Sequence, residues 1–224
     1  LMLKVEFLSY HRDGLQIFSG MSFNVAAGTC MFVTGQNGSG KTTLLRLLAG
    51  FLPVQQGKIT INGTEISKNH DFIAQNIDYL GHRNATKNQL TVWENLTFWN
   101  SICEPLDRID LEKNFNDTML ISSIKNQPIS ICSSGQKRRV ALTRLHMSNK
   151  KLWLLDEPAS SLDKQAIDNF STLVKRHCLG GGAALITTHN ALNIPDINST
   201  SLEMKKVSTE RTETNADPFL SGDW

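Results

Sequence analysis

The chain has 224 residues, which suits one well-buried domain and is too short for two ordinary ones. Its 23 lysines and arginines nearly balance 21 aspartates and glutamates, and a formal net charge of +2 argues against a broad basic surface for nucleic acid. No apolar run has the length of a membrane span, and residues 1–6 are too charged for a secretory signal, so we expect membrane contact only through partners.

The first strands are predicted at residues 3–8 and 21–25, around a turn at residues 11–14. They are typical of an antiparallel edge beside a nucleotide site. The apolar run at residues 30–33 predicts a strand that leads into a glycine-rich loop and then a helix over residues 43–48. Gly50 and Pro53 end that helix, and further strands are expected at 57–61, before the hairpin turn Asn62-Gly63, and at 77–81.

The glycine-rich loop at residues 35–42 matches the phosphate-binding pattern G-x-x-x-x-G-K-[ST] at every fixed position. Glycines let backbone N–H groups turn towards a phosphate chain, and the following helix directs its positive end at the same charge. Lys41 would reach the β- and γ-phosphates, and the Thr42 hydroxyl would bind Mg²⁺. The predicted nucleotide-binding residues are Gly35, Gln36, Asn37, Gly38, Ser39, Gly40, Lys41, Thr42 and Thr43.

A helical lobe is predicted at about residues 85–150, inserted into the sheet domain. Thr91 and Glu94 have the spacing of a capping box at the start of one helix, and an amphipathic helix is expected over 107–125. The aromatic residues of the first helix, which include Trp93 and Trp99, would fill a small core or form part of a docking face for another protein; the first reading is favoured.

The sheet resumes with buried strands at residues 151–155 and 183–188, joined by a crossover helix over 163–178. Residues 1–207 are therefore predicted to form the domain, and residues 208–224 a polar tail without assigned secondary structure.

Two carboxylates, Asp156 and Glu157, end the first of these strands, and His189 follows the second. In an open parallel sheet the carboxyl edge is where ligands bind. Asp156 is suited to hold Mg²⁺ opposite Thr42, and Glu157 to orient and polarise an attacking water. The His189 imidazole could hydrogen-bond a γ-phosphate, although a lone histidine is more often structural.

A second small-residue loop, residues 132–136, opens another helix and offers hydroxyls and a helix N-terminus to an anion. A chain that already holds a nucleotide needs no second phosphate cradle of its own. The loop would make sense if it closed on a nucleotide held by another copy.

The cysteines Cys30, Cys103, Cys132 and Cys178 include no C-x-x-C pair, which argues against a zinc site or a disulfide framework and for a reducing compartment. The histidines His70, His146 and His177 are interpreted as surface or packing residues, with no sign of haem contact.

The loop 35–42, CSSGQ at 132–136, LLDEP at 154–158, the segment 160–163 and His189 together resemble the ABC-type ATPases, in that family's order and spacing over nearly the whole chain. The resemblance implies an α/β P-loop NTPase fold with a mostly parallel sheet, an antiparallel β edge and an inserted helical lobe. It also implies an ATPase that binds ATP and Mg²⁺ as a head-to-tail homodimer with two ATPs at the interface. In that arrangement Glu157 is the catalytic base, Asp163 couples the two sites, and the signature residues that act in trans are Ser133, Ser134, Gly135 and Gln136.

The chain departs from the family's pattern at several positions. Cys132 and Ser134 stand where L-S-G-G-Q has leucine and glycine, and His82 stands where a coupling glutamine is usual. The aromatic residue that usually stacks on adenine is displaced, with Arg12 nearest to its place and Tyr10 close by.

Within the family, several features resemble the CcmA group, the ATP-binding subunits of cytochrome c maturation: Gly81-His82, the segments 15–23, 90–96, 140–145 and 185–192, and the short chain after His189. The resemblance implies membrane partners similar to CcmB and CcmC, release of the haem-loaded chaperone CcmE, and a peripheral position on the cytoplasmic face of the bacterial inner membrane.

Three alternatives stay open. The chain could be the ATPase of another exporter, for lipid or peptide. It could be a soluble ABC protein of translation or DNA repair, although it has neither a second cassette nor a long inserted coil. It could also be a regulatory nucleotide-binding module with weak turnover, which His82 and Cys132 motivate.

Overall fold

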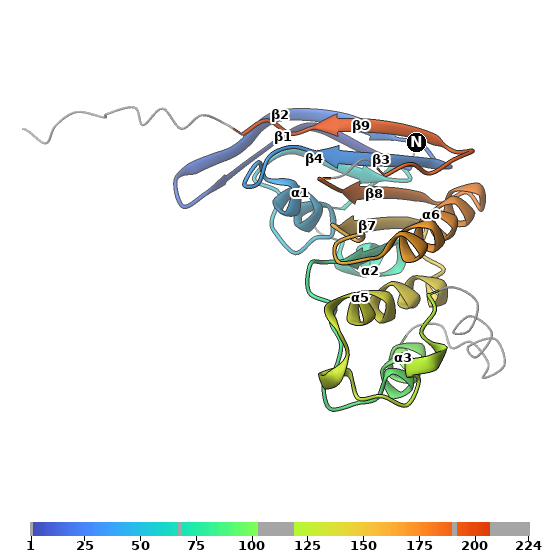
Figure 1. Ribbon diagram of the computed structural model, residues 1–224. Coiled ribbons are helices and arrows are strands. Elements are labelled where there is room, and N and C mark those ends of the chain that lie inside the picture. Colours follow the sequence, from blue (N-terminus) through green and yellow to red (C-terminus); the bar gives the residue numbers. More distant parts are fainter. Residues whose placement is uncertain (1, 67–68, 103–118, 190–191, 207–224) are drawn as a thin grey trace, which may run out of the picture.

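The computed structural model describes residues 2–66, 69–102, 119–189 and 192–206. Two stacked sheets and a helical region below them form this part of the chain (Figure 1). One sheet has the order β2-β1-β4-β5 with antiparallel pairing, and the other has the order β6-β7-β8-β3-β9 with parallel pairing. The predicted α/β class with a parallel core is confirmed, and the antiparallel strands pair with one another in a sheet of their own.

The antiparallel sheet consists of β1 (Leu3–Arg12), β2 (Leu15–Val25), β4 (Gln56–Ile61) and β5 (Thr64–Glu65). Its first two strands are longer than predicted because Asp13 and Gly14, with φ of 51° and 76°, turn the chain within two residues. The predicted hairpin after β4 is confirmed, since Asn62 and Gly63 also have positive φ, of 48° and 81°.

The parallel sheet consists of β3 (Thr29–Thr34), β6 (Ile77–Leu80), β7 (Leu152–Asp156), β8 (Ala183–Thr187) and β9 (Asn198–Glu203). The first four lie close to their predicted bounds. The last was not predicted, because its sequence is polar and its side chains are mostly exposed. Pairing with β3 holds it in the sheet, and Leu202 is its apolar contact with the core.

Both faces of the parallel sheet are buried, in two separate hydrophobic clusters. Along β7, Leu152 and Leu154 join the cluster beneath the antiparallel sheet, together with α1 (Lys41–Leu48). Trp153 and Leu155 join the opposite cluster, together with α6 (Lys164–Leu179) and the helical region. Alternate residues therefore pack on opposite layers, which explains the unbroken apolar run.

The helical region contains α3 (Val92–Ile102), α5 (Ser134–Thr143) and short 3₁₀ turns at Ser122–Ile124, Ile129–Ile131 and Arg144–Met147. The capping box is confirmed: the Glu94 carboxylate accepts a hydrogen bond from Thr91 N at 2.8 Å, and Thr91 Oγ1 accepts one from Glu94 N at 3.2 Å. The α2 helix (His70–Asn76), beside the parallel sheet, was not predicted. The limits chosen for the lobe and the domain stay predictions.

The predicted helix over 107–125 is wrong in its last part. Leu120 has a φ of 53°, which a right-handed helix does not allow, and a 3₁₀ turn follows it. Residues 107–118, Cys103 and the tail 208–224 lie outside the described residues. None of the helices within the described ranges is long and apolar enough to cross a membrane.

Candidate functional site

The glycine-rich loop lies between β3 and α1 and is tightly packed from below. A Cβ atom at Gly40 would lie 2.6 Å from Cγ2 of Ile17, and one at Gly35 would collide with the carbonyl oxygen of Met204. Gly38 has a φ of 79° and no heavy atom within 4 Å of an added Cβ. The loop is thus supported underneath and open above, as a backbone cradle for an anion requires.

Two polar side chains of this loop are arranged to receive a ligand with acceptor oxygens. Lys41 is buried, and its Nζ donates to the carbonyl oxygens of Gly35 at 2.8 Å and Gln36 at 3.1 Å. Ser39 is also buried, and no described residue forms a hydrogen bond with its Oγ. Gln36 and Asn37 are exposed at the mouth, and Thr43 is half-buried on α1. A phosphate chain would satisfy these donors.

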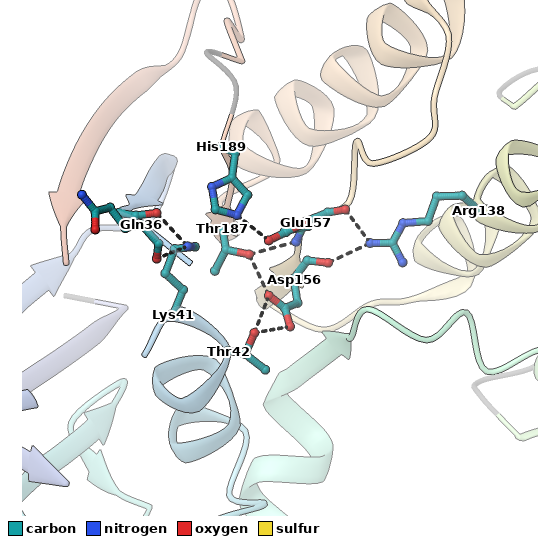
Figure 2. A network of polar contacts seen from close by, with 9 residues as sticks. Gln36, Lys41, Thr42, Arg138, Asp156, Glu157, Thr187 and His189 are labelled. Carbon is teal, nitrogen blue, oxygen red and sulfur yellow. Dashed lines mark hydrogen bonds and ion pairs between the residues drawn. The ribbon is translucent and has the colours of Figure 1, made fainter. Parts of the chain in front are cut away.

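Asp156 lies beside the start of α1, as Figure 2 shows. Thr42 Oγ1 donates to its Oδ2 at 2.9 Å, and Thr187 Oγ1 donates to its Oδ1 at 2.8 Å. Asp156 is only 2% exposed. The structure therefore brings Thr42 and Asp156 together as hard oxygen groups of the kind that Mg²⁺ prefers. No group of three or more His, Cys, Asp or Glu side chains in the described ranges could hold a metal by itself.

Glu157 is held at several points in an unusual backbone conformation. Its φ is 47°, in the left-handed region that costs a side chain about 1–3 kcal/mol. Its N–H donates to Thr187 Oγ1 at 2.8 Å, and its carbonyl oxygen accepts from Arg138 Nη2 at 2.9 Å. His189 Nε2 lies 2.8 Å from Oε1 of its carboxylate (Figure 2). Glu157 and His189, predicted from separate strands, thus meet.

Thr187 and Arg138 are not among the site residues predicted from the sequence. A threonine at the end of an apolar strand carries no special signal. Arg138 lies in the basic run 137–139, which resembles a solvated face. It could have been found from its spacing, because it lies one helical turn before the buried Leu142 on α5.

The second small-residue loop begins α5. Ser133 Oγ accepts from Gln136 N at 3.2 Å, and Gln136 Oε1 accepts from Ser133 N at 2.8 Å, which completes a capping box. Ser133 and Ser134 are exposed. A Cβ at Gly135 would lie 2.6 Å from the carbonyl oxygen of Ser161, so glycine permits this close approach.

The serine-rich loop and the phosphate loop are separate sites within this chain. In the part of the chain that the structure describes, no hydrogen bond or ion pair joins residues 133–136 to residues 35–42. Asp163, the N-cap of α6, accepts from Ala166 N at 2.9 Å and pairs with Arg139 Nη2 at 2.6 Å. Asp163 therefore links α6 to α5.

The remaining candidates lie apart from this cluster. His82 is exposed after β6, and no hydrogen bond or ion pair between described residues links it to Glu157. Tyr10 is buried against Phe18, with ring centroids 6.4 Å apart, while Arg12 is exposed beside Asp13. The departure at Cys132 has a simple reason: its side chain is buried in the core, where a thiol replaces leucine as an apolar group.

The other cysteines and histidines have packing or surface positions. Cys30, Cys132 and Cys178 are buried free thiols. His70 is exposed on α2, and His177 stacks on Trp153 with centroids 3.7 Å apart. His146 Nδ1 lies 2.6 Å from Arg176 Nη2, and burial next to this cation lowers the pKa of His146 to about 3.

Comparisons with known proteins agree with these motifs. The family model described as ABC transporter matches residues 18–160. A curated relative from Mesorhizobium japonicum, called cytochrome c biogenesis ATP-binding export protein CcmA, is 41% identical over 197 residues, or 87% of this chain and 94% of the relative. A protein of the same name from Reclinomonas americana is 37% identical over 86% of this chain and 89% of the relative. Another from Yersinia pseudotuberculosis is 34% identical over 95% of this chain and 94% of the relative.

Solved structures share the fold at lower identity. A putative ABC transporter ATP-binding protein from Pyrococcus furiosus matches with a TM-score of 0.77 and 20% identity, over 90% of this chain and 96% of that chain. A dimeric ATP-binding cassette, bound to ADP and phosphate in a post-hydrolysis state, matches with a TM-score of 0.72 and 20% identity, over 84% and 88%. Since the family model covers more than half of the chain and the curated relatives align along most of it, the protein belongs to the ABC transporter family, as a CcmA-like ATP-binding subunit of the ATP-hydrolysing type.

Proposed function

We propose that this protein is the ATP-hydrolysing subunit of a haem exporter complex for cytochrome c biogenesis. The observation that carries the proposal is the alignment with several proteins named as CcmA, at 34–41% identity along most of both chains. Hydrolysis would drive the release of a haem-loaded chaperone resembling CcmE. The site chemistry supports the ATPase part of this function independently of the names.

The phosphate loop fits the triphosphate of ATP. Ser39 Oγ has no hydrogen-bond partner among the described residues, and the space at Gly38 is open. Lys41 Nζ, which donates to two carbonyl oxygens of the loop, would also donate to phosphate oxygens. Thr42 and Asp156 would hold Mg²⁺, which would neutralise charge on the phosphates.

Glu157 would act as the general base of hydrolysis. Its carboxylate would accept a proton from the attacking water, and Thr187 and Arg138 hold its backbone in place. His189 contacts this carboxylate now and has a side chain exposed enough, at 38%, to reach a γ-phosphate as well. Together they would orient the water and respond to loss of the γ-phosphate.

The exposed serine loop supports a homodimer in which each copy completes the other's site. Ser133, Ser134, Gly135 and Gln136 lie at the N-terminus of α5, where free N–H groups and hydroxyls attract an anion. Asp163 would couple the two sites to each other, and His82 would couple them to movement of the helical region.

An apolar groove beside the helical region supports the proposed membrane partners, which would resemble CcmB and CcmC. It has a volume of about 570 Å³ and is lined by α2, β6 and α3, with Phe51 and Ile102 at 62% and 67% exposure. Exposed apolar side chains around a groove are typical of a protein contact. The aromatic residues of α3 fit both a core and a docking face, since Trp99 is buried and also lines this groove. Binding there would place the subunit on the cytoplasmic face of the bacterial inner membrane.

Purification from membranes in detergent tests the assignment. We expect the chain to be recovered with membrane subunits of cytochrome c maturation. Recovery with an unrelated permease would assign the ATPase to another exporter.

Glu157→Gln tests the chemistry, with Glu6→Gln on β1 as a matched surface control. We expect the complex to lose about 10²-fold or more in hydrolysis while ATP binding persists. If the unaltered complex shows no Mg²⁺-dependent hydrolysis, the regulatory alternative is correct.

A further inference from the structure

Arg138 forms the most extensive side-chain contact network of the site, although no sequence motif assigns it a role. It lies on α5, is 2% exposed, and uses all of its N–H groups. Nε donates to Pro158 O at 3.0 Å, Nη1 to Gly81 O at 3.0 Å and Asn84 Oδ1 at 3.1 Å. Nη2 donates to Asp156 O at 2.8 Å and Glu157 O at 2.9 Å.

These contacts join three segments that are far apart in the sequence. One is the turn after β7, which carries Asp156 and Glu157. Another is the loop after β6, where Gly81 and Asn84 flank the exposed His82. The third is α5 itself. Figure 2 shows the guanidinium reaching the backbone of both carboxylate residues from the side opposite Lys41 and His189.

Most of the partners are backbone carbonyls, so Arg138 holds the main chain of Asp156 and Glu157 and makes no contact with their carboxylates. Thr187 holds the N–H of Glu157 and Arg138 holds its carbonyl oxygen. A residue whose N–H and carbonyl oxygen are both held by hydrogen bonds can keep a positive φ that would otherwise relax. Burial lowers the pKa of Arg138 to about 10, which still leaves it charged at neutral pH.

The same side chain extends from the helix that begins at the serine loop. Ser133 is the N-cap of α5, and Arg138 follows it by five positions, or about 7–8 Å of helix. A shift of Glu157 that moved α5 through Arg138 would therefore also move Ser133, Ser134 and Gly135. Lysine could not replace arginine here, because an ammonium group has only three N–H donors and cannot satisfy all five acceptor oxygens.

We propose that Arg138 is a positioning residue that couples the two ATP sites of the dimer, fixing Glu157 in its own copy while it sets the orientation of the serine loop presented to the other copy. The inference rests on the proposed function, because the second half of the coupling requires the dimer. It assigns this coupling to a residue outside the phosphate, carboxylate and serine loops.

The test uses Arg138→Met and Arg138→Lys in the full chain, with Lys137→Met on the same helix as the matched control. We measure the dissociation constant of a fluorescent ATP analogue, kcat and KM for hydrolysis, and thermal unfolding. For Arg138→Lys we expect nucleotide affinity and KM to change by less than about threefold, while kcat falls at least about tenfold. Lys137→Met should resemble the unaltered chain in every measurement.

A second measurement follows ATP-dependent dimerisation in the Glu157→Gln background by sedimentation. Adding Arg138→Lys should raise the dimer dissociation constant at least about tenfold, and adding Lys137→Met should not. A merely structural role predicts that stability, affinity and kcat fall together. That result, or normal kcat and dimerisation in Arg138→Lys, would overturn the inference. If Arg138→Met does not fold, Arg138→Lys alone decides.

Failure of the proposed function gives a different pattern. In that case the Glu157→Gln chain itself, with Arg138 intact, shows no ATP-dependent dimer in either the free or the assembled form. The coupling proposal fails when the parent dimerises and hydrolyses ATP but the Arg138 variants match Lys137→Met.

Discussion

Replacing Thr187 by valine should damage the site more than its small volume change suggests. The side chain is fully buried, and its hydroxyl both donates to Asp156 Oδ1 and accepts from Glu157 N, each at 2.8 Å. Valine has nearly the same shape but no hydroxyl, so the substitution removes two hydrogen bonds and creates almost no cavity. The effect therefore reports on polar contacts and not on packing.

The expected cost follows from the partners that remain. Glu157 N–H would have no replacement acceptor, and leaving such a donor unsatisfied costs about 1–3 kcal/mol. Asp156 would keep its contact with Thr42, so it adds only about 1 kcal/mol. We expect Thr187→Val to lower the free energy of unfolding by about 2–4 kcal/mol. Thr187→Ser, which keeps the hydroxyl and loses a methyl group, should cost about 1 kcal/mol.

Urea unfolding and ATPase assays of the two variants measure this difference. With a slope of about 2–3 kcal/mol per molar urea, the valine variant should unfold about 1 M earlier than the unaltered chain. Its kcat should also fall, because the positive φ of Glu157 loses one of its two restraints. Equal midpoints and equal kcat for the valine and serine variants would refute the reasoning.

Three further substitutions test other contacts. Gly135→Ala places a Cβ 2.6 Å from Ser161 O, so ATP-dependent dimerisation should weaken in sedimentation while ATP binding by the single chain is kept. Thr91→Ala removes the cap of α3 and should cost about 1 kcal/mol in urea unfolding, and Thr91→Ser much less. The pKa of His146 is lowered to about 3 from 6.5, so between these pH values the unfolded chain binds a proton at this residue and the native chain does not. Stability from this group is complete above pH 6.5 and is lost as the pH falls towards 3, by about 2 kcal/mol between pH 6.5 and 5. His146→Gln should reduce that loss in urea titrations at the two pH values.

Patterns that depend on near neighbours were predicted well from the sequence. The buried strands β3, β7 and β8 are apolar on both faces apart from polar residues at their ends, and a strand enclosed on both sides must have such a sequence. The capping box at Thr91 and Glu94 and the Asn62-Gly63 turn are also local. Each depends on residues within about four positions of one another, so a short stretch of sequence is enough to predict it.

Features that depend on distant partners were missed. The polar strand β9 is defined only by its pairing with β3, which lies far away in the sequence. Arg138 is buried because two remote segments, residues 81–84 and 156–158, present acceptor oxygens to it, and its own neighbours are lysine and arginine. The helix predicted through residue 125 fails at Leu120, where a positive φ ends any helical pattern.

The register of three strands explains why residues so far apart form one site. In the order β7-β8-β3, Thr187 pairs with Asp156 on one side and with Val33 on the other. The strands are parallel, so the chain leaves all three at the same edge, into the carboxylate turn, the His189 loop and the phosphate loop. A slip of β8 by one residue would turn Thr187 to the opposite face and separate it from both Asp156 and Glu157. The apolar cores on the two faces resist that slip, because it would also exchange Leu185 and Ile186 between them. The packing that makes the sheet stable is therefore the same packing that places the hydroxyl of Thr187 between the two carboxylate residues.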